Sequence, residues 1–286
     1  MKDGIMDVHF VEIRDQQREA WDEFSPKWKK MDSLVLYSLK RVSDEMISVM
    51  GLQPDSYVLD VATGTGEPGL TIAERCPQGR TVFADISKGM LEIAGEKARR
   101  RGIGNIETCI SDVCELPFEN NSFDAVCCRF GFMFFPDMQL AASEMARVLK
   151  PGGKMAASFW NIPEKNFWIT AMMDSVNRNL GLPSPGPSTP HMFRCSKPGF
   201  MNKLLTKAGI NDISESEIQG RMDCKITDVY WHLMSNITVP LVTPLTKVDA
   251  VIRQRIKTEV FQAINERFAD GEVAPESSAI VIYGTK

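Results

Sequence analysis

Apolar and polar positions alternate with several different periods along the chain, and each period predicts a kind of element. Over residues 34–49, apolar side chains recur at three- and four-residue intervals, which is the spacing of one buried helix face. We therefore expect a helical segment over residues 12–50, broken near Pro26 because proline disrupts a helix interior. Residues 1–11 show no pattern and are expected to form a loose tail.

The following stretch alternates short apolar runs with helical patterns. Strands are predicted over residues 57–61, 81–84, 106–110, 123–128 and 154–160, and helices over residues 68–75, 87–101 and 137–149. Ser87 suits an N-cap and Gly102 suits the residue that follows a helix end, while Pro151-Gly152-Gly153 predicts a turn. Strands that alternate with helices predict a doubly wound α/β fold, with a parallel sheet covered on both faces.

The pattern changes again after residue 160. Helices are predicted over residues 161–180, 197–208, 227–236 and about 246–268, strands over 213–218 and 279–283, and a proline-rich loop over 181–195. We expect three parts: an N-terminal helical lid segment (1–50), a ligand-binding core (51–160), and a second helical lid with the last two strands of the sheet (161–286).

Composition narrows the class of protein. The chain has 286 residues, a net charge of −4 and no long run of Lys or Arg, which disfavours nucleic-acid binding. No apolar stretch reaches the ~18 residues of a membrane span, and the N-terminus lacks the apolar region of a signal peptide. Seven cysteines without a CxxC pair favour neither a metal site nor a disulfide framework, so we expect a reduced, cytoplasmic protein.

One glycine-rich segment carries most of the chemical information. Residues 58–69, Val-Leu-Asp-Val-Ala-Thr-Gly-Thr-Gly-Glu-Pro-Gly, contain G-x-G-x-x-G directly after a predicted strand and before a predicted helix. Glycines let the backbone turn sharply and approach a ligand closely. The fingerprint alone fits a dinucleotide-binding fold as well as an S-adenosylmethionine-binding fold.

Two aspartates at strand ends bear on that choice. Asp60 lies beside the glycine loop, where a diphosphate at ~4 Å and an effective dielectric of ~20 would be repelled by ~4 kcal/mol. The same carboxylate would attract the ammonium and sulfonium of S-adenosylmethionine, unless it only caps a loop amide. Asp85 ends the second strand, about 20 residues further on, where a carboxylate accepts the ribose hydroxyls of either cofactor.

Five motifs in order give a specific resemblance. They are residues 58–69, Phe83-Ala84-Asp85-Ile86-Ser87-Lys88-Gly89-Met90-Leu91, Ser111-Asp112-Val113-Cys114-Glu115-Leu116-Pro117-Phe118, Phe123-Asp124-Ala125-Val126, and Arg147-Val148-Leu149-Lys150-Pro151-Gly152-Gly153. Over about residues 55–160 the chain resembles class I S-adenosylmethionine-dependent methyltransferases, and within them the ubiquinone/menaquinone-biosynthesis-like (methyltransferase type 11) branch. The resemblance implies a Rossmann-like seven-stranded sheet of order 3-2-1-4-5-7-6, whose last strand is antiparallel.

The resemblance also implies the cofactor, S-adenosylmethionine, and the residues that hold it. The residues expected to bind the methionine end are Asp60, Ala62, Thr63, Gly64, Thr65 and Gly66. Asp85 is expected to bind the ribose, and Ile86, Met90, Asp112 and Val113 are expected to contact the adenine. Arg129 is expected to line the methyl-transfer pocket. Asp112 is also consistent with a plain turn residue, and Arg129 with a structural ion pair. No metal is implied.

The methyl acceptor is expected to be a small, largely apolar molecule, methylated at carbon or oxygen. The lid segments hold many aromatic residues and methionines, which suit an apolar ligand, although most such residues pack in cores. His191, His232 and Tyr37 are the candidate bases, and carbon methylation of an electron-rich ring needs no dedicated base. The segment Arg129-Phe130-Gly131-Phe132 disfavours the subclass that methylates nucleobase or glutamine amino groups.

Two other functions remain open, and a third is disfavoured. The glycine loop also fits a NAD(P)-dependent oxidoreductase, and the fold also fits a non-catalytic binding protein. Arsenite methylation is disfavoured because the glycine loop has no cysteine and Cys195 and Cys224 are far apart in sequence. A small molecule is the expected partner, with no nucleic acid, and the oligomeric state stays open, a homodimer included.

Overall fold

A seven-stranded sheet in the order β3-β2-β1-β4-β5-β7-β6 forms the centre of the molecule, as expected from the sequence. The computed structural model describes residues 8–186, 189–237, 239–269 and 271–286. The strands are β1 Tyr57–Val61, β2 Arg80–Asp85, β3 Ile106–Ile110, β4 Phe123–Arg129, β5 Leu149–Trp160, β6 Asn211–Arg221 and β7 Glu276–Thr285. β7 runs antiparallel to β5 and β6, and the remaining neighbours are parallel.

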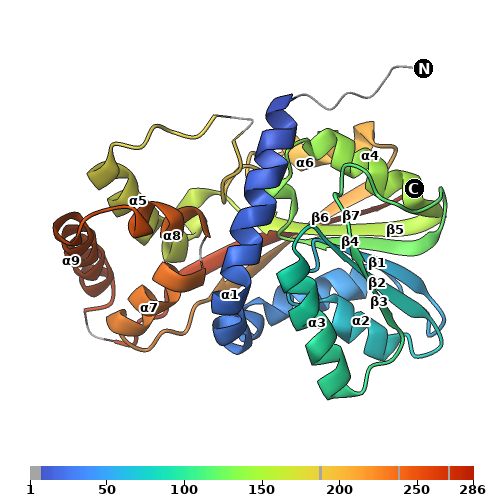
Figure 1. Cartoon of the computed structure of the whole chain (residues 1–286), viewed down its shortest axis with the longest axis horizontal. Helices are drawn as coiled ribbons and strands as arrows, with labels where there is room; N and C mark the ends of the chain where they lie inside the picture. Colours follow the sequence, from blue (N-terminus) through green and yellow to red (C-terminus); the bar gives the residue numbers. More distant parts are fainter. Residues whose placement is uncertain (1–7, 187–188, 238, 270) are drawn as a thin grey trace.

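The helices lie in layers on the sheet and in a separate group beyond its end (Figure 1). α2 (Gly69–Arg75) and α3 (Lys88–Arg101) lie on one side, and α4 (Met138–Val148) and α6 (Phe200–Lys207) on the other. The separate group consists of α5 Phe167–Leu180, α7 Thr227–Ile237, α8 Val239–Thr246 and α9 Ala250–Arg267. Because helices cover both faces, the central strand β1 is almost entirely buried. In the described part of the chain no helix is long and apolar enough to cross a membrane.

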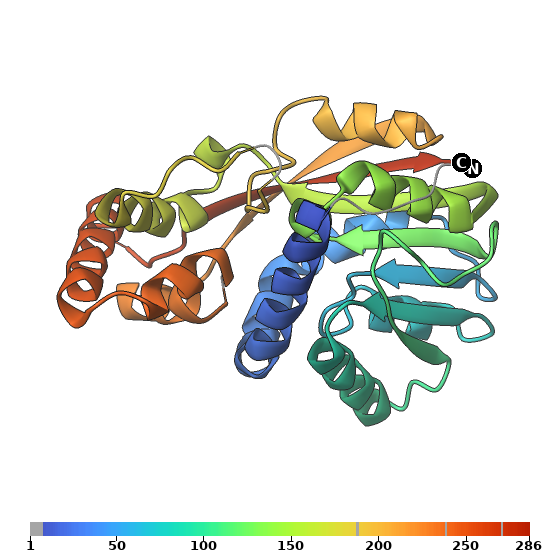
Figure 2. The ribbon, with the colours of Figure 1, turned by 45° about the horizontal axis from the view of Figure 1, so that its top comes forward.

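A single long helix, α1 (Val8–Val49), lies between the sheet and the separate helical group (Figure 2). The expected break at Pro26 is wrong, as is the loose tail over the described residues 8–11, while residues 1–7 lie outside the description. Proline removes the N–H that would bond the carbonyl of Asp22. The Ser25 hydroxyl donates to that carbonyl instead, at 3.0 Å, so the helix continues without an unsatisfied group.

Several predicted boundaries also differ. The predicted turn at Pro151-Gly152-Gly153 falls within the bounds of β5 as an irregularity in its pairing with β4, where Gly152 has a φ of 77° and donates its N–H to the carbonyl of Lys286 at 2.9 Å. The predicted helix over about 246–268 is α9, which begins at Ala250 because Asp249 caps its start by accepting from the Ile252 N–H, and α8 before it was not predicted. The predicted helix over 161–180 is the short 3-10 helix η2 (Pro163–Lys165) followed by α5.

Helix α3 follows the prediction closely. The Ser87 hydroxyl accepts a hydrogen bond from the Met90 N–H at its start, and Gly102 is left-handed at its end. These caps fix where α3 begins relative to Asp85, the last residue of β2, and so position one wall of the cavity described next.

Candidate functional site

A cavity of about 190 Å³ lies at the carboxyl ends of β1, β2 and β4, under α1. This is the edge at which ligands bind in open parallel sheets. One half of its wall comes from the glycine loop, from the end of β2 and from the loop after β3. The other half is apolar and comes from α1, the 3-10 helix η1 (Phe132–Phe134), β5, α5 and two later loops.

Asp60 lies beneath the glycine loop and is fully buried. Its Oδ2 accepts hydrogen bonds from the Thr63 hydroxyl at 2.7 Å and from the Gly69 N–H at 2.9 Å. Burial raises the pKa of Asp60 to about 6, although these hydrogen bonds lower it. A Cβ at residue 69 would lie 2.7 Å from the same Oδ2, so this approach requires glycine. Asp60 therefore holds the loop in shape from below and is not part of the cavity wall.

Asp85 reaches the cavity wall from the end of β2. Its Oδ2 accepts from the Gly64 N–H at 2.8 Å and its Oδ1 from the Ser87 N–H at 2.9 Å. Burial is the main cause that raises the pKa of Asp85 to about 6, and the nearby Asp22 carboxylate adds to the increase. A carboxylate has about four acceptor positions. Asp85 thus keeps capacity for two further hydrogen bonds from a ligand.

The loop after β3 presents acceptors without partners to the cavity. The Oδ2 of Asp112 and the hydroxyl of Ser111 are buried and have no hydrogen-bond partner within the described residues. The other oxygen of Asp112 accepts from the Cys114 N–H at 2.9 Å, which fixes the orientation of the carboxylate. Buried polar atoms are seldom left unpaired, so these two indicate a bound ligand.

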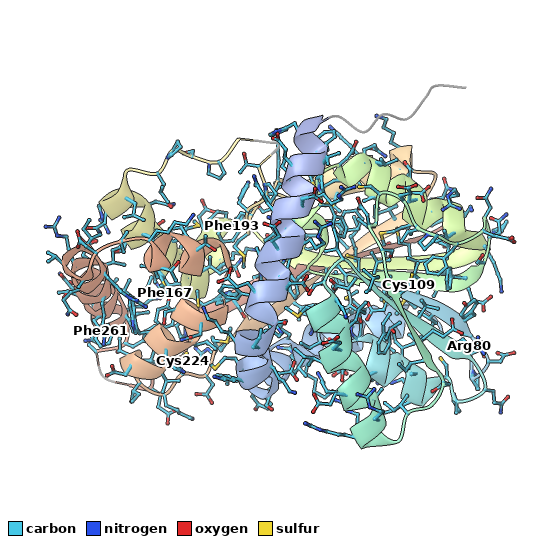
Figure 3. All side chains as sticks on the ribbon, viewed as in Figure 1. Arg80, Cys109, Phe167, Phe193, Cys224 and Phe261 are labelled. Carbon is cyan, nitrogen blue, oxygen red and sulfur yellow. The ribbon has the colours of Figure 1, made fainter. Side chains whose placement is uncertain are left out.

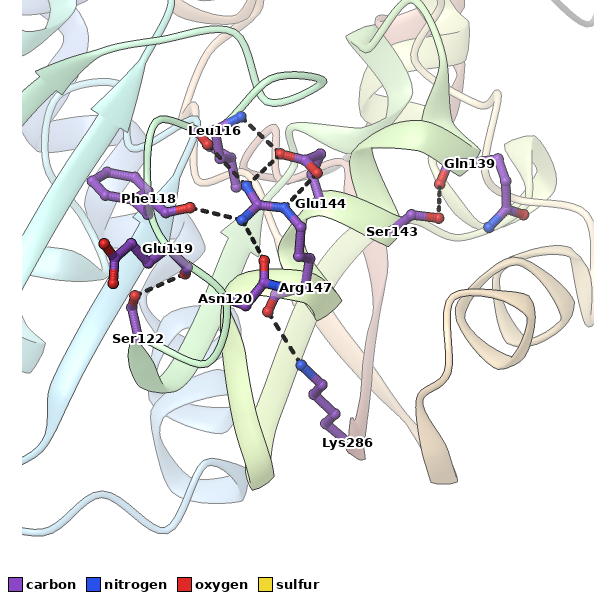
Figure 4. A network of polar contacts seen from close by, with 10 residues as sticks. All are labelled: Leu116, Phe118, Glu119, Asn120, Ser122, Gln139, Ser143, Glu144, Arg147 and Lys286. Atoms are coloured by element: carbon purple, nitrogen blue, oxygen red, sulfur yellow. Dashed lines mark hydrogen bonds and ion pairs between the residues drawn. The ribbon is translucent and has the colours of Figure 1, made fainter. Parts of the chain in front are cut away.

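This loop is fixed in place from α4 (Figure 4). The Arg147 guanidinium donates to the carbonyls of Phe118 at 2.7 Å and Leu116 at 2.9 Å, and it pairs with Glu144. Glu144 in turn accepts from the Leu116 N–H at 3.0 Å. The arginine of the fifth motif therefore positions the third motif, which explains why the two occur together.

Two aspartates of α1 complete the polar half, and the sequence analysis missed both. Asp22 accepts from the Ser87 hydroxyl at 2.6 Å and from the Gly89 N–H at 3.0 Å, at the start of α3. Asp32 accepts from the Thr65 hydroxyl at 2.5 Å and forms an ion pair with Lys97 at 2.8 Å. Their own sequence neighbourhoods gave no signal, because each aspartate acts on a residue more than 30 positions away.

The other half of the cavity is lined by aromatic rings in two groups. Trp21 packs edge-on against Trp28 and against Phe134, with ring centroids 5.9 and 5.4 Å apart. Phe130 stacks on Trp160 at 4.3 Å, and Trp160 meets Trp168 edge-on. All six rings line the cavity. This wall suits a flat apolar molecule.

The structure brings most of the expected binding residues to one cavity. Ala62, Thr63, Gly64, Thr65, Asp85, Ile86, Met90, Asp112, Val113 and Arg129 line it, whereas Asp60 and Gly66 do not. Gly66 has a φ of 102° and supports the turn of the loop instead.

The candidate bases do not reach the cavity. Tyr37 is 74% exposed and His232 is also exposed. His191 is half-buried, which lowers its pKa, and its Nδ1 accepts from the Phe193 N–H at 3.3 Å. No His, Tyr, Lys or Cys side chain lines the cavity in the part of the chain that the structure describes.

The seven cysteines are all free thiols, and none of them lines the cavity. Cys109 lies on the sheet side of the molecule and Cys224 in the helical group (Figure 3). Burial raises the pKa of the Cys195 thiol to about 12, which makes it a poor thiolate. An arsenic-binding set of thiols is therefore not supported.

Comparisons with known proteins agree with this geometry. Residues 58–153 match the model of a methyltransferase domain. A demethylmenaquinone methyltransferase of Listeria welshimeri is 34% identical over 152 residues, which are 52% of this chain and 64% of that protein. The chain thus matches less than two thirds of that relative's length.

Solved structures share the fold at low sequence identity. The YcgJ protein of Bacillus subtilis superposes with a TM-score of 0.56 at 20% identity, covering 86% of this chain and 98% of that one. Phosphoethanolamine N-methyltransferase 2 of Haemonchus contortus, solved with S-adenosylhomocysteine, gives 0.52 at 18% identity, covering 86% of this chain and 52% of that one.

Proposed function

The chain belongs to the class I S-adenosylmethionine-dependent methyltransferases, and on this premise we propose that it methylates a small, largely apolar organic molecule. Carbon and oxygen are the atoms that we propose to receive the methyl group. When bound, S-adenosylmethionine supplies a methyl group on a sulfonium centre, which a nucleophile displaces in line. The chain's own part is to hold the two ligands in line and to exclude water.

One observation carries this proposal over a nicotinamide cofactor. A diphosphate at a glycine loop binds free N–H groups at the start of the following helix. Here the Gly69 N–H donates to Asp60 and the Thr71 N–H donates to Glu67, at 2.9 and 3.3 Å. The chain's own carboxylates therefore occupy the anion site of α2, and a diphosphate would meet their negative charge.

The residues on the wall fit a cationic nucleoside. The unpartnered Oδ2 of Asp112 can accept from an adenine amino group, and the two oxygens of Asp85 can accept from ribose hydroxyls. Ile86 and Met90 provide apolar surface for a flat base. Asp60, charged beneath the loop, favours a positive ligand without touching it.

Helix α1 closes the cavity. Its contacts through Asp22 and Asp32 hold it against α3 and the glycine loop, and Trp21 and Trp28 line the space between. We propose that α1 excludes water from the reacting atoms. Seven free thiols fit a reducing, cytoplasmic setting.

The test is transfer of a labelled methyl group. The protein is incubated with methyl-labelled S-adenosylmethionine and fractionated metabolite extract, and we expect label in an apolar, small-molecule fraction. Asp85→Ala is the control and should abolish the uptake. Tight binding of S-adenosylhomocysteine without uptake in any fraction would contradict catalysis and support the non-catalytic alternative.

A further inference from the structure

The guanidinium of Arg129 lies on the cavity wall with little to neutralise it. Its hydrogen bond is to the Ser43 hydroxyl, at 3.3 Å, and no carboxylate oxygen of the described residues lies within 4 Å of it. Burial lowers the pKa of Arg129, while Asp60, Glu67 and Asp32 act on it only at longer range. A guanidinium stays protonated in proteins, so this is a half-buried cation that lacks a close carboxylate partner.

Helix α1 shows where along the cavity this cation lies. Asp22 contacts the start of α3 beside Asp85, and Asp32 contacts Thr65 of the glycine loop. Ser43, which contacts Arg129, follows roughly 16 Å further along the axis, at a rise of about 1.5 Å per residue. Arg129 is therefore displaced from Asp85 along the cavity, on the side of the glycine loop where Asp60, Glu67 and Asp32 act on it.

The surroundings of Arg129 are aromatic. Arg129 is opposite Ser158 in the pairing of β4 with β5, and Trp160 follows on β5. Phe130 stacks on Trp160 at 4.3 Å and lines the same wall. A flat ring that lies along this wall would bring a substituent to the guanidinium.

We propose that Arg129 is the anion subsite for the methyl acceptor, which binds as a flat, apolar molecule carrying an anionic oxygen group. The group is a carboxylate or an ionised acidic hydroxyl, the chemistry that a planar guanidinium fork binds best. The inference rests on the proposed function, since it identifies the acceptor class of the same cavity. An acidic hydroxyl that binds ionised has already given its proton to water, so no base is needed on the wall.

Arg129 has charged neighbours on each side that bear on this site. Asp60 lies on β1, Glu67 in the glycine loop and Asp32 on α1, and the Cys127 thiol precedes Arg129 on β4. Asp60 accepts from Thr63 and Gly69, Glu67 pairs with Arg101, and Asp32 pairs with Lys97. Each of these carboxylates is already engaged. Arg14 also lines the cavity but pairs with Asp15 at 3.0 Å, which leaves the Arg129 guanidinium available to a ligand.

The test compares two probes of one shape, 2-naphthoate and its neutral amide, 2-naphthamide. Binding is followed by quenching of tryptophan fluorescence, with S-adenosylhomocysteine present and absent. We expect the wild-type protein to prefer the carboxylate by about tenfold or more, and Arg129→Met to remove that preference. Arg129→Lys keeps the positive charge but loses the planar guanidinium, so it should retain part of the preference for the carboxylate.

The matched control is Arg41→Met, which removes an exposed arginine two residues before Ser43 that bonds the carbonyl of Gln219. It should keep the full preference. If Arg129→Met does not fold, Ser43→Ala and Arg129→Lys still test the geometry, since each should reduce the preference. A wild-type protein that binds both probes equally, or neither, overturns the proposal.

The same experiment tells whether the anionic group that binds Arg129 belongs to the methyl acceptor or to the cofactor. If Arg129→Met keeps its affinity for S-adenosylhomocysteine and loses the naphthoate preference, the acceptor site is supported. If affinity for S-adenosylhomocysteine falls and the preference remains, Arg129 serves the cofactor's carboxylate and the proposal is wrong. A wild-type protein that prefers naphthoate but does not bind S-adenosylhomocysteine would refute the proposed function and keep the anion subsite.

Discussion

The two halves of the cavity are built in opposite ways. In the polar half, loops are fixed by carboxylates that bond backbone N–H groups, as Asp60, Asp85 and Asp112 do. In the other half, packed aromatic rings form the wall and Arg129 is the charge among them. The first half is suited to recognition through hydrogen-bond geometry, whereas the second is suited to recognition through ring packing and the charge of Arg129. The contrast teaches that the two proposed ligands would be recognised by different kinds of interaction.

The largest effect is expected from Asp85→Ala. The substitution would remove the two charge-assisted hydrogen bonds that we propose between Asp85 and the ribose, and it leaves the Gly64 and Ser87 N–H groups without their Asp85 acceptor. We expect binding of S-adenosylhomocysteine to weaken by ~2 kcal/mol or more, measured by calorimetry. Binding of naphthoate in the apolar half should not change. Equal loss of both ligands would show that the halves are not independent.

A pH titration should give the next largest effect. The pKa values of Asp60 and Asp85 are raised to about 6, so both carboxyls take up protons as the pH falls through 6. The cationic ligand S-adenosylmethionine favours their ionised forms. For one such group, affinity for S-adenosylmethionine should fall about tenfold from pH 7 to pH 5. Asp85→Asn should show a shallower dependence, and the same slope in both proteins would contradict the assignment.

A smaller effect tests the connection of α1 to the glycine loop. Asp32→Asn loses the ion pair with Lys97 and weakens the bond from Thr65. In a double-mutant cycle with Thr65→Val, we expect a coupling free energy of about 1 kcal/mol in the binding of S-adenosylhomocysteine. Additive effects of the two substitutions would mean that α1 does not hold the loop.

The smallest effect should come from Tyr37→Phe. The Tyr37 ring is 74% exposed and lies outside the cavity wall. We expect unchanged methyl transfer and a change in the free energy of unfolding within about 0.5 kcal/mol. A large loss of activity would restore Tyr37 as a base and require α1 to rearrange on binding.

The sequence predicted the polar half much better than the apolar half, for a physical reason. Ala62, Asp85 and Asp112 follow strand ends, and parallel strands bring their carboxyl ends to one edge whatever lies between them. The aromatic wall is assembled from α1, β4, β5 and α5, whose contacts depend on packing. No local pattern encodes which rings of these elements meet.

Three individual outcomes show the same limit of local sequence patterns. Asp60 was expected at the ligand, yet a glycine at position 69 lets it bond the backbone of its own loop. Asp22 and Asp32 act across large separations in sequence, on Ser87 and Thr65, so a local reading of α1 could not assign them. Pro26 did not break α1, because a neighbouring hydroxyl replaced the missing donor.

The central claim is that the acidic, glycine-lined half of the cavity selects a sulfonium nucleoside over a dinucleotide. Isothermal titration of the wild-type protein with S-adenosylmethionine and, separately, with NAD⁺ measures this directly. We expect tight, saturable binding of S-adenosylmethionine and no heat of binding from NAD⁺. Tight binding of NAD⁺ without any binding of S-adenosylmethionine would contradict this claim.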